Sequence, residues 1–98
     1  MGAEMVIELD DRDGAQAVMH ALESYKDRLR SSISRTKRLL AGFEKTYGVS
    51  TAHFLAHMAA EDLADGDMEY VQWAGEAQLL NRLEAELEEL ENARCQLP

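Results

Sequence analysis

The chain has 98 residues and a formal net charge of −9, from 19 Asp and Glu against 10 Lys and Arg. A chain of this length forms one domain. Its acidity argues against nonspecific binding of the whole protein to DNA, RNA or anionic membranes. Ala, Leu, Glu and Arg are abundant while Val, Ile and aromatic residues are scarce, which is typical of long helices and coiled coils rather than sheets. We therefore predict an all-α protein.

The sequence has no feature of a membrane or secreted protein. No apolar run approaches the roughly 18–20 residues of a membrane span, and no basic-then-apolar signal segment opens the chain. The one cysteine, Cys95, excludes an internal disulfide framework and fits a reducing compartment. We expect a cytoplasmic protein with no membrane partner.

Residues 1–13 are predicted to form an extended N-terminal segment. It contains an apolar run at residues 5–9 that has the length of a short strand. A lone strand cannot satisfy its own edges, so this run either pairs with another chain or stays extended.

A first helix is predicted at about residues 14–47. Apolar side chains recur along it every three or four residues, and Gly48 is a good left-handed stop. The predicted stripe consists of Val18, Leu22, Tyr25, Leu29, Ile33, Leu40, Phe43 and Tyr47, with Thr36 filling the gap.

Two further helices are predicted at about 51–60 and 67–94, separated by an acidic loop. Ser50 is a suitable N-cap for the short one. Phe54, Leu55 and Met58 form its apolar edge. The stripe of the long one steps regularly by three and four, through Tyr70, Trp73, Ala77, Leu80, Leu83, Leu87 and Leu90.

Two long helices joined by a short helical connector predict a coiled-coil-like, antiparallel hairpin domain over residues 14–98. Gly42 and Gly75 fall near the same end of this hairpin. Each costs about 1 kcal/mol against Ala in a helix, so either the helices cross closely there or the glycines are neutral. A single two-helix layer leaves apolar surface wet, so we expect a homodimer that forms a helical bundle. The predicted core and interaction residues are Leu22, Tyr25, Leu29, Ile33, Leu40, Phe43, Tyr47, Phe54, Trp73, Leu80, Leu83, Leu87 and Leu90.

Charge is sorted along the two long helices. Residues 14–47 carry seven Lys and Arg against three acids, and residues 61–98 carry two Arg against eleven acids. The basic residues of the first helix have three interpretations. They could contact nucleic acid or an acidic partner, form an ordinary solvated face, or pair with the glutamates of the third helix. We favour the match, because antiparallel packing brings those glutamates beside residues 20–35. The basic set is Lys26, Arg28, Arg30, Arg35, Lys37, Arg38 and Lys45, and the glutamates are Glu84, Glu86, Glu88, Glu89 and Glu91.

Three residues come nearest to a metal site. His53, His57 and Glu61 are spaced i, i+4 and i+8, so that on one helix all three share a face. The His-Glu-x-x-His context of a zinc peptidase is missing, and a polar side of an amphipathic helix explains the pattern as well. We predict no metal and no cofactor.

The sequence predicts no enzyme. His20 has no Asp, Ser or Cys companion at a fixed spacing, and Cys95 has Glu91 nearby, which raises rather than lowers a thiol pKa. There is no Gly-rich phosphate loop.

Two stretches of the chain resemble a known family. Residues 47–55 read Tyr-Gly-Val-Ser-Thr-Ala-His-Phe-Leu, and residues 67–76 read Asp-Met-Glu-Tyr-Val-Gln-Trp-Ala-Gly-Glu. Such a pair, joined by an acidic loop and followed by a leucine-rich helix, resembles the TumA-like group of small prokaryotic antitoxins over about residues 16–91. The resemblance implies binding to a cognate toxin. It also implies a scaffold role, rather than a catalytic one, for Tyr47, Phe54, Leu55, Trp73 and Gly75.

We therefore predict a non-catalytic helical module for protein–protein interaction, the antitoxin-like partner of a small prokaryotic toxin. It would act by occlusion, with residues 5–9 or an exposed helix face covering the toxin's active surface. The alternatives are a nucleic-acid-binding regulator that uses the basic face of the first helix, and a His-based metal-binding helical protein.

Overall fold

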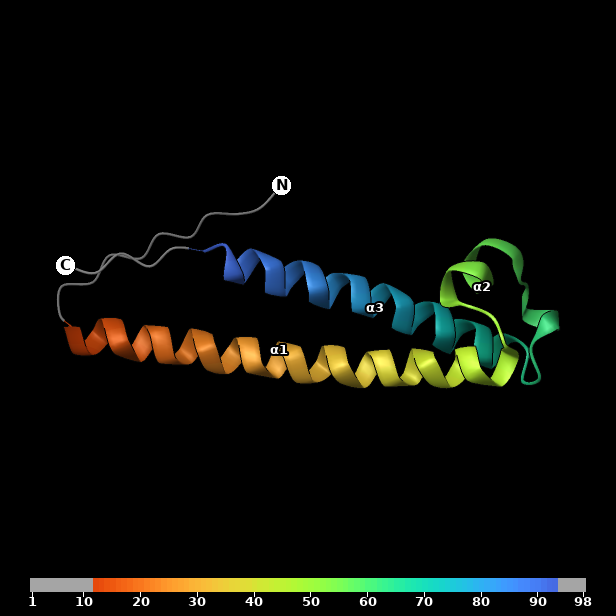
Figure 1. Ribbon diagram of the computed structural model, residues 1–98, viewed down its shortest axis with the longest axis horizontal. Coiled ribbons are helices and arrows are strands. Elements are labelled where there is room, and N and C mark those ends of the chain that lie inside the picture. Colours follow the sequence, from red (N-terminus) through yellow and green to blue (C-terminus); the bar gives the residue numbers. More distant parts are fainter. Residues whose placement is uncertain (1–11, 94–98) are drawn as a thin grey trace. The chain divides into compact units, whose positions relative to one another are not determined.

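The computed structural model describes residues 12–93, and all the regular structure in that range is helical (Figure 1). The elements are α1 (Arg12–Tyr47), α2 (Thr51–His57), the short 3-10 helix η1 (Ala60–Asp62) and α3 (Asp67–Glu91). The prediction of an all-α fold with a long first helix packed on a third helix is confirmed. Residues 5–9 and Cys95 lie outside the described range, so what was expected of them stays a prediction.

Both ends of the helical region differ slightly from the predicted limits. α1 already includes Arg12 and Asp13, so the extended segment predicted for residues 1–13 is wrong at its last two positions. An acid in the first helical turn, here Asp13, favours this longer start. α3 ends at Glu91 instead of about residue 94. Its last turn is acidic and contains no basic residue, which opposes the helix dipole and shortens the helix.

α2 is shorter than predicted and ends at His57 rather than at about residue 60. Met58 has extended backbone angles (φ −108°, ψ 151°), and Ala59 is extended too (φ −117°, ψ 168°). The Ala59 amide donates to the Asp62 carboxylate at 2.9 Å. This side-chain bond caps η1 and replaces the backbone bond that a continuing α2 would have supplied.

The chain forms two compact units. Within the described residues, the terminal unit comprises residues 12–32 and 83–93, and the central unit comprises residues 33–82. α1 and α3 each contribute to both units, whereas α2 and η1 belong to the central unit alone.

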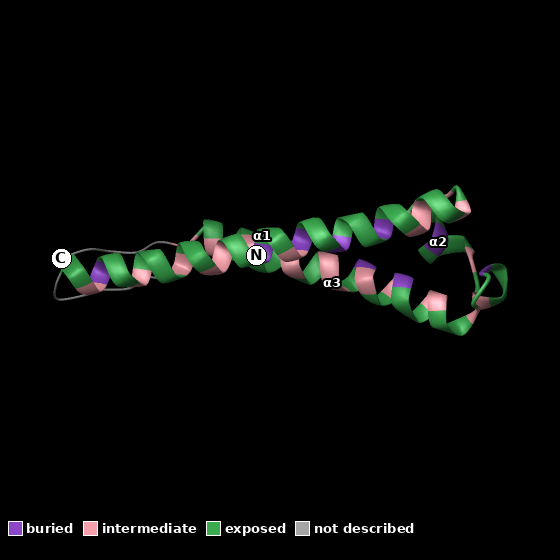
Figure 2. Cartoon of the chain, turned by 90° about the horizontal axis from the view of Figure 1, so that it is seen from below, coloured by how far each residue is buried: buried purple, intermediate pink, exposed green. Residues whose placement is uncertain are grey.

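The hydrophobic core of the central unit joins all three α-helices. Buried and half-buried positions of α1 and α3 lie on the sides that face each other (Figure 2). Tyr47 at the end of α1 bonds to Glu69 at the start of α3, while Leu40, two turns earlier in α1, shares a cluster with Ala77, two turns later in α3. The two helices are therefore antiparallel in this unit. The buried members of the cluster are Leu40, Phe54, Leu63, Trp73 and Ala77.

Of the two explanations left open for Gly42 and Gly75, a close crossing of α1 and α3 is contradicted. A Cβ atom added to either glycine would meet nothing within 4 Å, and both residues are exposed. Large side chains fill the space between the helices at this level, since the Phe43 and Trp73 rings stack there with centroids 5.1 Å apart. Gly48 does have the left-handed backbone that its sequence position predicts (φ +67°) and ends α1.

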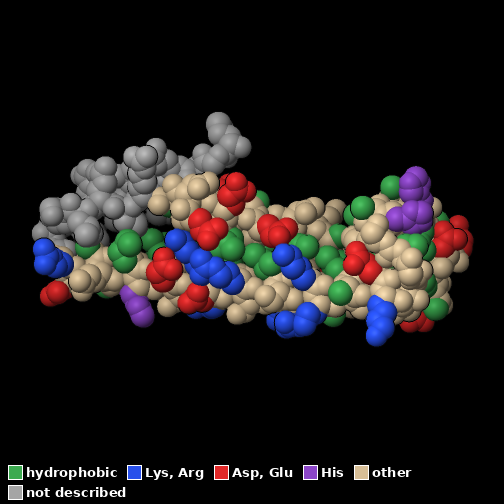
Figure 3. All heavy atoms as spheres, viewed as in Figure 1, with side chains coloured by type: hydrophobic (Ala, Val, Ile, Leu, Met, Phe, Trp, Pro, Cys, Tyr) green, Lys and Arg blue, Asp and Glu red, His purple; other side chains and the backbone are tan. Residues whose placement is uncertain are grey.

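In the terminal unit, polar contacts join α1 and α3 beside the apolar stripes. The Tyr25 hydroxyl donates to Glu86, and the Arg30 guanidinium contacts Glu91 at 3.3 Å and Asp27 at 2.9 Å. Acidic and basic side chains gather along the surface here (Figure 3). Apart from the buried Leu29, the apolar stripe residues of this unit are only half-buried.

Burial varies along the predicted core. The residues with little exposed surface are Leu29, Ile33, Leu40, Phe54 and Trp73. The half-buried ones are Leu22, Tyr25, Phe43, Tyr47, Leu80, Leu83, Leu87 and Leu90. Leu63 is buried although it falls in the acidic loop that was predicted between the second and third helices.

Candidate protein-interaction groove

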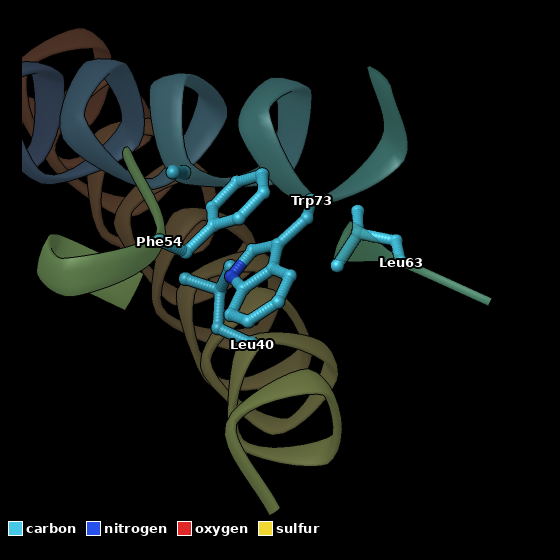
Figure 4. Close-up of a cluster of buried hydrophobic side chains, with 5 residues drawn as sticks. Leu40, Phe54, Leu63 and Trp73 are labelled. Atoms are coloured by element: carbon cyan, nitrogen blue, oxygen red, sulfur yellow. The ribbon is translucent and has the colours of Figure 1, made fainter. Parts of the chain in front are cut away.

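The site is built on a stack of aromatic rings around Trp73. Its indole has no exposed surface and lies against Phe54, with ring centroids 4.0 Å apart and planes within 4° of parallel (Figure 4). Phe43 of α1 stacks on the same indole, and Tyr47 follows at 5.7 Å. The tryptophan of α3 therefore lies between an aromatic side chain of α2 and two of α1. Aromatic pairs at centroid distances of about 4.5–7 Å, such as Phe43 and Tyr47 with Trp73, add about 0.5–1.5 kcal/mol each beyond simple burial.

Hydrogen bonds hold the first turn of α2 onto the two long helices. Thr51 Oγ1 accepts from the Trp73 indole N–H at 3.0 Å, and the Thr51 amide donates to Glu44 Oε2 at 2.7 Å. The N-cap hydroxyl of Ser50 accepts from the His53 amide at 3.0 Å, as its sequence position predicts. An isolated helix of seven residues is unstable in water, so these contacts and the aromatic stack decide where α2 lies.

An apolar groove of about 470 Å³ opens between α2 and the two long helices of the central unit. Its lining is mostly apolar with a few polar groups, as in sites that accept small or peptide ligands. The lining residues are Lys37, Leu40, Glu44, Thr51, Ala52, Leu55, Ala77, Leu80 and Asn81.

Leu55 is the large apolar residue of this lining that is exposed. Phe54 and Leu55 were predicted to share one apolar edge of the helix; Phe54 is buried, while Leu55 is 49% exposed. Adjacent residues of a helix are 100° apart, so a seven-residue helix with one aromatic anchor buries one of them and presents the other. The groove therefore has an apolar wall that nothing in the described chain covers.

A second hydrogen-bond network closes the turn at the start of α3. The Tyr47 hydroxyl donates to Glu69 and accepts from the Ala64 amide at 2.9 Å, and the Asp65 amide donates to Glu69 at 2.8 Å. The bond to Glu69 raises the pKa of Tyr47. The bonds from Tyr47 and from the Asp65 amide lower the pKa of Glu69. This network stabilises the loop below the aromatic stack.

The fold does not bring together His53, His57 and Glu61, the three residues whose spacing most resembles that of a metal site. The His53 and His57 rings are 5.0 Å apart on α2. Glu61 lies beyond the end of that helix, in η1, so the i+8 spacing no longer places it on the same face. Within residues 12–93, no group of three or more His, Cys, Asp or Glu side chains is placed to hold a metal ion.

The basic residues of α1 are only partly matched by the glutamates of α3. Arg30 reaches Glu91, as the antiparallel arrangement predicts. In contrast, Arg35, Arg38 and Lys45 are exposed and make no ion pair or hydrogen bond with any described residue. All three belong to the central unit, where the facing part of α3 is aromatic and aliphatic rather than acidic. Matching therefore explains part of the basic set only.

The sequence predicted the buried residues beside the groove but not the groove itself. Phe54, Trp73 and Leu40 were predicted from their helical spacing. The polar lining, from Glu44 and Thr51 to Asn81, carries no spacing signal, because it comes from three helices that only the folded chain brings together.

Comparison with known proteins finds no match among protein families, curated proteins or solved structures. None of the helices between residues 12 and 93 is both long and apolar enough to pass through a lipid bilayer.

Proposed function

We propose that this chain is a non-catalytic helical module that binds another protein in the groove of the central unit. The observation that carries the proposal is an open, mostly apolar groove with Leu55 half exposed on its wall. A groove with such walls suits the apolar face of an amphipathic helix or a few large apolar side chains.

The partner that we propose is a small prokaryotic toxin, with this chain acting as its antitoxin in the cytoplasm. The support is the resemblance of residues 47–55 and 67–76 to TumA-like antitoxins. These two segments contribute Thr51, Leu55 and the Trp73 anchor to the groove and its support. Occlusion is the mechanism: the exposed helix face beside the groove would cover the toxin's active surface while the groove holds an apolar segment of the toxin.

The test is coexpression of the full chain with the product of a small gene next to its own. We expect a stable complex on size exclusion and relief of growth arrest. Leu55→Glu places a charge on the groove wall and should weaken the complex at least about tenfold. Ala56→Glu is the matched control, since Ala56 is exposed on the same helix and does not line the groove. Equal binding by both variants would contradict the groove as the binding site.

The unmatched cations of α1 favour a second candidate, a regulator that binds nucleic acid. Arg35, Arg38 and Lys45 repeat at helical spacing on one exposed side. Binding through phosphates would weaken steeply with added salt and would be lost in an Arg35→Glu, Arg38→Glu double variant. The net charge of −9 opposes this function, so we place it second. No binding to a labelled duplex at low salt would exclude it.

We also infer that the chain forms a homodimer. The stripe residues Leu83, Leu87 and Leu90 remain half-buried in a single chain, and the most exposed large apolar side chains belong to α3 of the central unit. Apolar surface of this kind is covered in many small helical proteins by a second copy.

A further inference from the structure

Between Met68 and Arg82, the side of α3 that faces away from Trp73 carries no acidic residue. Met68 and Val71 on this side are 80% and 69% exposed, the highest values among the large apolar residues that the structure describes. Elsewhere α3 is rich in glutamate. We call this side the outer face of α3, formed by Met68, Val71, Gln72, Gly75, Gln78, Leu79 and Arg82.

Gly75 lies at the centre of the outer face and is not used by the fold of the single chain. It is exposed, and an added Cβ would meet no atom within 4 Å. A glycine inside a helix costs about 1 kcal/mol relative to Ala. Because glycine has no side chain, a second helix can approach the backbone closely there. The distance between the two helix axes can then be about 8 Å, at the lower limit of the usual 8–10 Å range.

The outer face is also symmetric about Gly75. Four residues before it is Val71 and four after it is Leu79, both apolar. Three residues before and after it are Gln72 and Gln78. A second α3 laid antiparallel, with a two-fold axis at Gly75, would set each of these residues against its counterpart from the other copy.

The ends of the face are complementary in charge. Seven residues after Gly75 is Arg82, which makes no ion pair with a described residue. In the antiparallel arrangement it falls beside Met68 of the second copy and next to the exposed Asp67. Two chains of charge −9 repel each other over a Debye length of about 8 Å, so contact is least opposed on a surface with few acids.

We propose that the outer face of α3 binds the same face of a second copy, antiparallel and centred on Gly75. A second copy is the occupant because the face matches itself in apolar and amide positions, and because its Arg82 end falls next to Asp67 of the other copy. This inference rests on the homodimer proposed above and not on toxin binding. The groove uses Ala77, Leu80 and Asn81 of α3, so it shares no residue with the outer face.

The first experiment is sedimentation equilibrium of the full chain and of two glycine variants. The wild type should approach twice the 11.0 kDa monomer mass as its concentration rises. Gly75→Gln should raise the dissociation constant of the dimer at least about tenfold, because its side chain occupies the crossing point. Gly42→Gln is the matched control, an exposed helical glycine of α1 with equally open surroundings. It should dimerise like the wild type, and circular dichroism should show both variants folded.

The second experiment tests the antiparallel register. In a Cys95→Ser background, the Val71→Cys, Leu79→Cys double variant should form a covalent dimer on mild oxidation. The two cysteines of one chain are about 12 Å apart along the helix, too far for a disulfide within the chain.

The outcomes separate the two levels of the proposal. A monomer at every concentration would overturn both the homodimer and its interface. A dimer that Gly75→Gln leaves as tight as the wild type, or that the cysteine pair does not crosslink, would overturn the outer face alone. A Gly75→Gln monomer that still binds the toxin would support the separation of the two surfaces.

Discussion

Phe54→Ala tests whether α2, and with it the groove, depends on one aromatic anchor. The Phe54 side chain has no exposed surface and stacks on Trp73 at 4.0 Å. Truncating a buried Phe to Ala typically costs about 3–5 kcal/mol. α2 has only seven residues and is unstable alone, so most of this loss should appear as local detachment of α2.

The assay follows the fluorescence of Trp73, which is the only tryptophan of the chain. Removing the ring that covers the indole should shift its emission to longer wavelength and reduce the urea concentration at the unfolding midpoint. Far-ultraviolet circular dichroism should change little, because α1 and α3 supply most of the helix. Binding of the proposed partner should be lost together with the groove.

Leu55→Ala is the control for this experiment. Leu55 is the neighbouring residue of the same helix but is 49% exposed, so its truncation should cost less than about 1.5 kcal/mol and leave the emission of Trp73 unchanged. If Phe54→Ala also left the emission unchanged and lost no more stability than Leu55→Ala, the stacked arrangement would be refuted.

Three further predictions concern stability. Thr36 is 1% exposed, and its hydroxyl has no hydrogen-bond partner among residues 12–93. Thr36→Val should therefore stabilise the chain by about 1 kcal/mol and raise the melting temperature; a lower melting temperature would mean that the hydroxyl is bonded. The bonds from Tyr47 and from the Asp65 amide hold the pKa of Glu69 below its ordinary 4.5, so their contribution is present above that pH and is lost as pH falls through the lowered pKa. Tyr47→Phe should therefore flatten the decline of the urea midpoint below pH 4.5, and an unchanged decline would count against the bond. Gly48→Ala should destabilise by about 1 kcal/mol in thermal unfolding, because φ is +67° there and Ala is strained in that conformation; equal stability would contradict that backbone.

The helices could be predicted from the sequence because their signals are local. Apolar residues three or four apart indicate a helix wherever they occur, and Gly48 and Ser50 mark an end and a start by their own backbone and side-chain chemistry. The structure has α1 ending and α2 beginning at those residues. The end of α2 was not predicted correctly because it depends on Asp62, which lies outside that helix. The Asp62 carboxylate accepts a hydrogen bond from the Ala59 amide, which would otherwise bond within a continuing helix.

The same periodicity does not say how deeply a stripe is buried. Leu40 and Leu87 occupy equivalent stripe positions, yet Leu40 is buried under the aromatic stack and Leu87 is half-buried in the terminal unit. The difference comes from α2, which covers the central unit only. A stripe identifies the side of a helix that packs, but the number of neighbours depends on the other segments.

The amino-acid sequence alone established three helices, their approximate limits, the apolar stripes and the uneven charge. The uneven charge follows from composition alone, and the helices and stripes follow from the spacing of residues at most four positions apart. The groove, the burial of Phe54 in place of Leu55 and the unmatched Arg35, Arg38 and Lys45 emerged only from the packed chain. The reason is that Trp73 holds α1 and α2 at distances set by the sizes of stacked rings from three separate segments, and no local pattern encodes those distances.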